Sequence, residues 1–220
     1  MLYRPNGHIK PLDFVGASVT ESTVDVGAYS VRQYPFNATG SGETDDAPSV
    51  ASCATKANGA GYAVTFPPGT YRLAGDVALG ACRFDAGASL LIEDGAVVTI
   101  SGDITAAPNQ ELFLYNGGQV KVTRQQRVYA NWWAVSGDDI AARWNRCVRA
   151  CRGNGPTEID LVGTHTTAGQ FDLSGWGATA VTFDLSGARL TTSSENPFRL
   201  RGSTNAQLLL GATDHNDGVT

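Results

Sequence analysis

The chain has 220 residues, 42% of them hydrophobic and 17% charged, so it can fill a core and differs from disordered segments and coiled coils, which carry more charge. Its formal net charge of −5 argues against a general nucleic-acid binder. The 26 glycines and 9 prolines follow no fixed triplet, which excludes collagen and is typical of many short strands joined by turns.

The N-terminal region has two prolines, an early glycine and no sustained period. We expect residues 1–23 to form an extended arm that another molecule holds in place. The first residues lack the apolar core of a signal peptide, and no apolar run reaches about 18 residues. We therefore expect neither secretory export nor a membrane span.

An acidic pair followed by a helical period opens the first structured unit. Asp45 and Asp46 precede apolar residues that recur with helical spacing up to Ala57. This pattern predicts a short helix over Ala47–Ala57, ended by Asn58-Gly59, with both aspartates as structural N-caps. A strand, a tight turn and a second strand are predicted over 62–73, followed by short glycine-punctuated strands.

The same layout occurs a second time further along the chain. Asp138 and Asp139 are predicted N-caps of a helix over Ile140–Cys151, which has apolar residues on one face and arginines on the others. Short strands follow this helix. Within them the sequence Phe-Asp-Leu-Ser-Gly occurs twice, from Phe171 and from Phe183.

A single short helix followed by many brief strands does not build βαβ units, which need one helix per crossover. The pattern favours a coil of stacked strands in which the helix covers the apolar end and the unpaired backbone edge of the first turn. We expect a mainly β chain of parallel β-helix or solenoid units with short N-terminal capping helices; a β-sandwich or jelly roll is the alternative. The expected divisions are an arm over 1–23, a first small unit over 24–128 and a second capped unit over 129–220.

Three segments of the first unit resemble a known family. They read Asp25-Val26-Gly27-Ala28, Gly42-Glu43-Thr44-Asp45-Asp46 and Phe66-Pro67-Pro68-Gly69-Thr70-Tyr71-Arg72-Leu73. They are similar to the entry segment of the pectate-lyase superfamily, right-handed parallel β-helices that include bacteriophage tailspikes, although Val26 replaces the usual aromatic residue. The run Tyr129-Ala130-Asn131-Trp132-Trp133-Ala134, followed by Gly137-Asp138-Asp139, resembles a second entry of this kind.

The resemblance implies a role in a virus particle. Two consecutive entries and no signal peptide favour the tailspike branch, so the chain would be the N-terminal, particle-binding part of a homotrimeric tailspike, made in the host cytoplasm and located in the virion tail. Residues 1–23 and the first unit would contact a phage tail or baseplate protein, and the distal part would contact host cell-surface polysaccharide. No capping element is visible after Leu210, so we expect either a longer tailspike or an end covered by partner subunits.

Carboxylate pairs are the first candidates for polysaccharide chemistry. Adjacent residues on one strand or loop point to different faces and cannot flank a glycosidic bond. We expect Asp45-Asp46 and Asp138-Asp139 to cap helices and Glu93-Asp94 to lie in a turn. No catalytic, cofactor-binding or metal-binding residue is therefore assigned. A polysaccharide hydrolase or lyase complete in this chain stays open as an alternative, as does a carbohydrate-binding module.

Four side chains are candidates for contact with a sugar or a neighbouring subunit: Trp132, Trp133, Arg143 and Arg146. Aromatic rings stack well on sugar rings, and arginines on a helix can meet acidic groups. If the two tryptophans lie in an extended segment, they point in opposite directions, so at most one is exposed.

The four cysteines contain no Cys-x-x-Cys pair. We expect them to be small buried residues in a reducing compartment. A zinc site built from Cys147, Cys151 and His165 is the alternative, but a fourth well-spaced ligand is not available.

Overall fold

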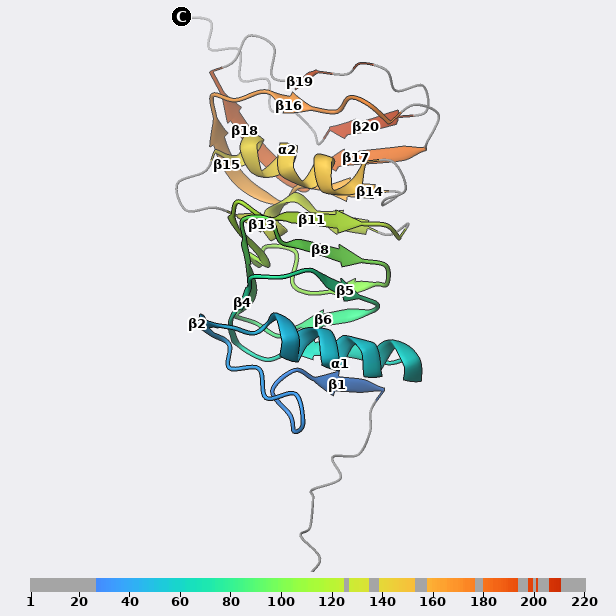
Figure 1. The fold of residues 1–220 in the computed structure, drawn as a ribbon. Coiled ribbons are helices and arrows are strands. Elements are labelled where there is room, and N and C mark those ends of the chain that lie inside the picture. Colours follow the sequence, from blue (N-terminus) through green and yellow to red (C-terminus); the bar gives the residue numbers. More distant parts are fainter. Residues whose placement is uncertain are drawn as a thin grey trace, which may run out of the picture.

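The computed structural model describes residues 27–124, 127–134, 139–152, 158–176, 180–193, 198–199, 201 and 206–210. The expected arm over 1–23 and the predicted cap Asp138 lie outside these residues. The described chain is mainly β, and its strands form parallel sheets stacked along one direction (Figure 1).

Three sheets make up the half of the molecule that is lower in Figure 1, and we call them the lower sheets. Their strands are as follows: sheet 1, β1 (Ala28–Ser30), β3 (Ala63–Phe66), β6 (Cys82–Phe84) and β9 (Ile104–Thr105); sheet 2, β2 (Ser41–Asp45), β4 (Gly69–Leu73), β7 (Ala88–Glu93), β10 (Phe113–Asn116) and β13 (Trp133–Ala134); sheet 3, β5 (Val77–Leu79), β8 (Val97–Ile100) and β11 (Gln119–Val122).

Three further sheets, the upper sheets, follow. Their strands are as follows: sheet 4, β12 (Arg127–Tyr129), β14 (Glu158–Asp160), β17 (Val181–Leu185) and β20 (Ala206–Leu210); sheet 5, β15 (Gly163–Thr167) and β18 (Ala188–Thr192); sheet 6, β16 (Phe171–Asp172) and β19 (Phe198–Arg199). Every pairing between these strands is parallel, whereas a jelly roll or sandwich is built from antiparallel strands. The alternative fold is therefore wrong.

The chain visits the sheets in a fixed cyclic order. From β3 onward it passes from sheet 1 to sheet 2 to sheet 3 three times, and from β14 onward it passes in the same way through sheets 4, 5 and 6. Helix α1 (Ala47–Ala60) follows β2 and helix α2 (Ile140–Cys151) follows β13, so each helix stands where the cycle would otherwise place a strand of sheet 3 or sheet 6. Figure 1 shows α2 above β11 and below β16.

The register of the strands brings apolar side chains from successive circuits into columns. In sheet 2, Tyr71 pairs with Leu90, Leu90 with Phe113, and Phe113 with Trp133, and all four side chains are fully buried. Side chains at alternate positions of a strand point to the same face, so each strand contributes two or three residues to the interior. The buried residues form one hydrophobic core that extends from Val31 to Leu185 and includes both helices.

Both predicted helices are confirmed. Helix α2 has the predicted bounds, and it packs on β11 and β13 on one side and on β15 and β16 on the other. Helix α1 runs three residues beyond Ala57, because Gly59 is tolerated within it. It ends at Gly61, whose φ of 72° is left-handed and suits glycine, while the Tyr62 amide donates to the Ala57 carbonyl at 2.9 Å.

Candidate functional site

The acidic pair before α1 has two different structural roles. Asp46 occupies the N-cap position, but its side chain makes no hydrogen bond to the helix, contrary to the prediction. Its buried carboxylate instead accepts hydrogen bonds from the backbone amides of Thr39 at 2.7 Å and Gly40 at 3.0 Å. The neighbouring Asp45 accepts from the Ala47 amide at 3.0 Å, so Asp45 satisfies a free amide of the first helical turn.

Asp139 at the start of α2 both caps the helix and holds a neighbouring strand end. Its carboxylate accepts from the Ala141 amide at 2.8 Å and from the Ala168 amide at 3.0 Å, and the Thr167 hydroxyl also donates to it. Burial raises the pKa of this carboxyl, but these hydrogen bonds outweigh burial and the net pKa is lowered. These hydrogen bonds give Asp139 a structural role at the start of α2.

Neither tryptophan that was predicted to contact sugar is available to a ligand. Trp132 is 1% exposed and Trp133 is fully buried. The Trp132 indole donates to the Ala107 carbonyl at 2.9 Å, and the Trp133 ring lies 4.9 Å from that of Phe113. The expectation was that at most one of them is exposed if the segment is extended. In the structure neither is exposed, because Ala130–Trp132 forms a 3-10 turn, after which both rings enter the core.

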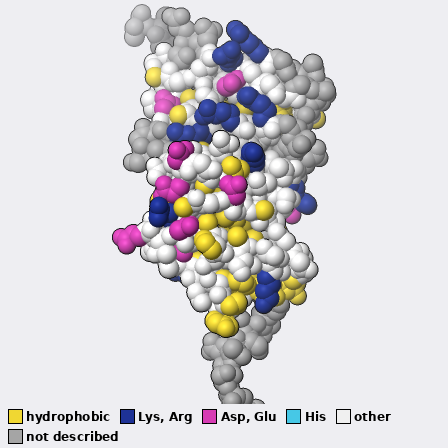
Figure 2. Space-filling model, in the orientation of Figure 1, with side chains coloured by type: hydrophobic (Ala, Val, Ile, Leu, Met, Phe, Trp, Pro, Cys, Tyr) yellow, Lys and Arg dark blue, Asp and Glu magenta, His cyan; other side chains and the backbone are white. Residues whose placement is uncertain are grey.

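The two candidate arginines lie on α2 and each contacts a residue of the lower half. The Arg143 guanidinium pairs with Glu111 at 2.7 Å, and the Arg146 guanidinium lies 5.2 Å from the centre of the Tyr115 ring. Figure 2 shows Lys and Arg side chains gathered on the upper half of this face, with acidic side chains below them. These arginines therefore fasten α2 to the lower sheets in addition to any contact with another molecule.

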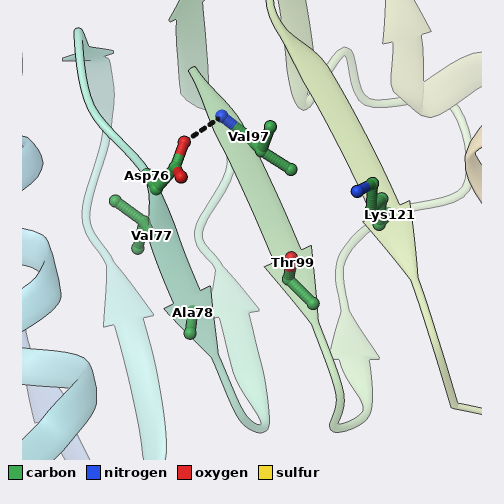
Figure 3. Close-up of a pocket in the computed structure, with 6 residues that line it drawn as sticks. All are labelled: Asp76, Val77, Ala78, Val97, Thr99 and Lys121. Atoms are coloured by element: carbon green, nitrogen blue, oxygen red, sulfur yellow. Dashed lines mark hydrogen bonds between the residues drawn. The ribbon is translucent and has the colours of Figure 1, made fainter. Parts of the chain in front are cut away.

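An open groove of about 340 Å³ lies over sheet 3 (Figure 3). Asp76, Val77, Ala78, Val97, Thr99 and Lys121 line it. The carboxylate of Asp76 accepts the Val97 amide at 2.8 Å, and the groove contains no second carboxylate. Glycoside hydrolysis uses two carboxyl groups about 5–9.5 Å apart, so the groove lacks the pair that this chemistry needs.

The third acidic pair, Glu93-Asp94, also has a structural role. Asp94 lies in a turn as predicted, whereas Glu93 is the last residue of β7. Glu93 accepts hydrogen bonds from Arg72 at 2.7 Å and from Asn116 at 2.7 Å. These partners come from strands β4 and β10 on either side of β7. The three side chains thus tie neighbouring strands of sheet 2 together.

The cysteines are buried and free, as predicted. Burial raises the pKa of Cys53 to about 12, so its thiol is neutral at physiological pH. Cys147 and Cys151 lie within the core, while a ring nitrogen of His165 is 2.8 Å from the Val162 carbonyl oxygen. In the part of the chain that the structure describes, these three residues do not form a group able to hold zinc.

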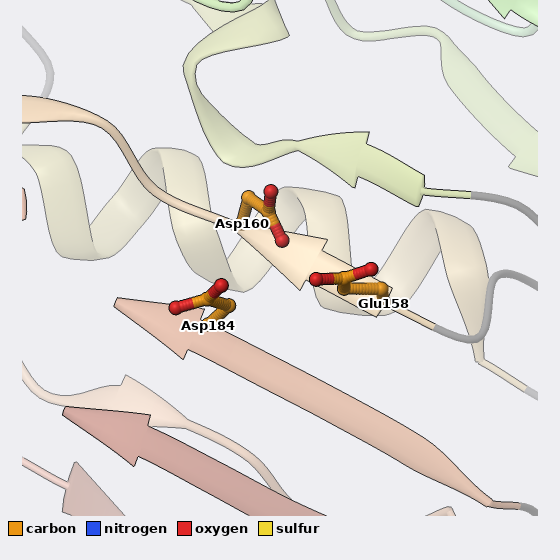
Figure 4. Close-up of side chains that lie close together, drawn as sticks. All are labelled: Glu158, Asp160 and Asp184. Atoms are coloured by element: carbon orange, nitrogen blue, oxygen red, sulfur yellow. The ribbon is translucent and has the colours of Figure 1, made fainter. Parts of the chain in front are cut away.

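A group of three carboxylates on sheet 4 was not predicted from the sequence, and we call it the carboxylate cluster: Glu158, Asp160 and Asp184 (Figure 4). One oxygen from each lies within 4.8 Å of one oxygen from each of the others. Glu158 and Asp160 alternate with buried Ile159 on β14, and Asp184 alternates with buried Phe183 on β17. Alternation could have indicated a shared face, but the pairing of β14 with β17 was needed to bring the three residues together.

One arginine compensates part of the charge of the carboxylate cluster. Arg127 of β12 lies 2.6 Å from a Glu158 oxygen and 3.3 Å from an Asp160 oxygen. Asp160 is 6% exposed, and its Oδ1 is buried without a hydrogen-bond partner. Burial raises the pKa of Asp160 to about 7, with Arg127 opposing and the two neighbouring carboxylates reinforcing this change.

Comparison of the chain with family models, curated proteins and solved structures gave no match. Among the described residues, no helix is both long and apolar enough to cross a membrane.

Proposed function

We propose that the chain is a structural part of a bacteriophage tail: the N-terminal, particle-binding portion of a homotrimeric tailspike that adsorbs to host surface polysaccharide. The proposal combines the resemblance of the Gly42–Asp46 and Phe66–Leu73 segments with the arrangement of the described strands. In this proposal the protein is located in the virion, residues 1–23 and the first unit contact a tail or baseplate protein, and the distal part faces the polysaccharide.

The observation that carries the proposal is the stacked, cyclic order of parallel strands around one core. We propose that the sheets are the faces of a right-handed parallel β-helix; the hand rests on the general rule that parallel crossovers are right-handed in about 98% of cases. In such a column each circuit packs on the next, and this suits an elongated structural part. Helix α2, packed between β11 and β16, continues the core from the lower into the upper sheets.

A polysaccharide depolymerase complete in this chain has less support. The groove over sheet 3 holds one carboxylate, Asp76. Of the carboxylates singled out from the sequence, Asp45, Asp46 and Asp139 accept backbone amides and Glu93 binds side chains of the neighbouring strands. If the chain alone cleaves a bacterial capsule or lipopolysaccharide, the structural proposal is overturned in favour of this alternative.

Mass in solution and incorporation into particles test the proposal. We expect a mass three times the 23.1 kDa of one chain by light scattering, and a stable monomer would contradict the trimer. In infected host cells, the tagged full chain should enter purified phage particles, whereas a chain lacking residues 1–23 should not. If the shortened chain forms trimers and enters particles as well as the full chain, attachment lies outside the arm.

A further inference from the structure

Like charges face each other on adjacent strands of sheet 4. Asp160 and Asp184 are direct register partners in the parallel pair of β14 and β17, and Glu158 precedes Asp160 by two residues on the same face. Neighbouring strands lie about 4.8 Å apart, and like charges placed opposite each other destabilise the pairing. With all three carboxylates ionised, the carboxylate cluster and Arg127 together carry two uncompensated negative charges.

The surroundings of Asp160 favour a proton at this position. Its Oδ2 faces Arg127, but its Oδ1 is buried and accepts nothing. A buried carboxylate oxygen without a donor is costly, whereas a protonated Oδ1 is itself a donor that a neighbouring carboxylate can accept. Figure 4 shows one oxygen of Asp160 pointing toward the space between Glu158 and Asp184.

The charged and titratable groups around Asp160 come from three neighbouring elements. Arg127 and Tyr129 face it from β12, Asp184 faces it from β17, and the charge of Asp160 acts on the buried Cys147 thiol of α2. Burial raises the pKa of Cys147, so this thiol brings no charge to the cluster. Hydrogen bonds from Ser186 lower the pKa of Asp184, so Asp184 keeps its negative charge when Asp160 is protonated.

We propose that the carboxylate cluster is a pH-sensitive lock, in which a proton on Asp160 holds β12, β14 and β17 together and loss of that proton to solvent weakens this part of sheet 4. The proton passes to water, and the negative charge left on Asp160 faces Asp184 and Glu158 across the strand pair. The lock does not depend on the proposed role in a virion.

The direction of the effect follows from the pKa of Asp160 in the two states. An aspartate in the opened strand pair loses its proton near pH 4, whereas Asp160 in the closed pair keeps it up to about pH 7. The stabilising contribution is therefore complete below about pH 4, declines as pH rises, and is lost above about pH 7. Because one proton is released on opening, the opening constant rises about tenfold per pH unit between these limits.

Hydrogen exchange on the full chain, read by mass spectrometry with a chelator present, tests this lock. Rates are measured from pH 5 to pH 8 and corrected for the intrinsic pH dependence of exchange. We expect the opening constant of peptides containing β14 and β17 to rise between pH 5 and pH 7 and then to level off. Peptides containing β4 and β7 of sheet 2 should show no such rise.

A repeated motif supplies a matched control. Asp184 and Asp172 both belong to a Phe-Asp-Leu-Ser-Gly sequence and both accept the amide two residues on, but Asp172 lies 3.7 Å from Arg152 and outside the carboxylate cluster. Asp184→Asn keeps the hydrogen-bonding shape and should move the levelling-off point to lower pH. Asp160→Asn should abolish the rise, and Asp172→Asn should leave it unchanged.

Two results would overturn the lock. The first is a native profile for β14 and β17 that Asp160→Asn and Asp184→Asn leave unaltered. The second is a profile that exists only in chelator and vanishes when Ca²⁺ is added, since the cluster would then hold a metal ion in place of the proton.

Discussion

Replacing Trp144 with alanine is expected to separate the unfolding of the upper sheets from that of the lower sheets. Trp144 lies on α2, is fully buried, and its ring centre is 5.7 Å from that of Phe171 and 5.8 Å from that of Phe183. Both phenylalanines belong to strands of the upper sheets, whereas α2 also packs on β11 below. The Trp144 side chain therefore packs the helix against the upper sheets, while other parts of α2 contact the lower sheets.

The size of the effect follows from the buried area of the indole. A buried tryptophan removes about 200 Å² from water, which at about 25 cal/mol per Å² corresponds to about 5 kcal/mol. Tryptophan-to-alanine changes in cores cost about 3–5 kcal/mol, so we expect the upper sheets to lose about 4 kcal/mol of stability. In a stack whose circuits contact only their neighbours, a local loss of stability lets the segments on either side unfold separately.

Urea unfolding followed by hydrogen exchange of separate peptides measures this prediction. The native chain should unfold in one transition because its core is continuous, while Trp144→Ala should lose protection first in sheets 4–6 and later in sheets 1–3. Trp133→Ala is the matched control, since Trp133 is also fully buried but packs on Phe113 in sheet 2. The reasoning fails if the two halves of Trp144→Ala unfold together, or if the variant loses less than about 1 kcal/mol.

Three further substitutions test individual contacts by their effect on urea unfolding. Asp46→Ala removes the buried carboxylate that accepts the Thr39 and Gly40 amides and should cost about 3 kcal/mol. Asp46→Asn keeps an acceptor and should cost less, and equal losses would contradict this role. A methyl group at Gly102 would overlap the backbone of Gly80 and Ala81, so Gly102→Ala should cost about 3 kcal/mol of unfolding free energy. A methyl group at Gly59 would point into open space on α1, so Gly59→Ala should stabilise the chain by about 1 kcal/mol. Similar effects at the two sites would refute the steric argument. Asp139 has a lowered pKa, so its contribution to folding stability is present above about pH 4 and is lost as pH falls further. The stability of Asp139→Asn should therefore depend less on acid than that of the native chain. Parallel acid unfolding of the two proteins would disprove this prediction.

The sequence by itself determined the positions of the helices and the presence of many short strands. The apolar period and the acidic residue before it predicted α2 with its actual bounds, because a helix is built from contacts within a few residues. The end of α1 was misplaced by three residues, since Asn58-Gly59 resembles a stop although the left-handed turn is made at Gly61. Short alternating runs between glycines likewise indicated strands, and all strand pairs proved to be parallel.

Only the tertiary structure decided which side chains meet across circuits. Trp132 and Trp133 were predicted as possible sugar contacts, but a short 3-10 turn directs both into the core. The carboxylate cluster exists because Asp160 and Asp184, 24 residues apart in the printed sequence, are register partners. Local alternation indicates the face on which a residue lies, but the length and path of the intervening loop set its neighbour on the next strand, and a shift of one residue would separate these two carboxylates.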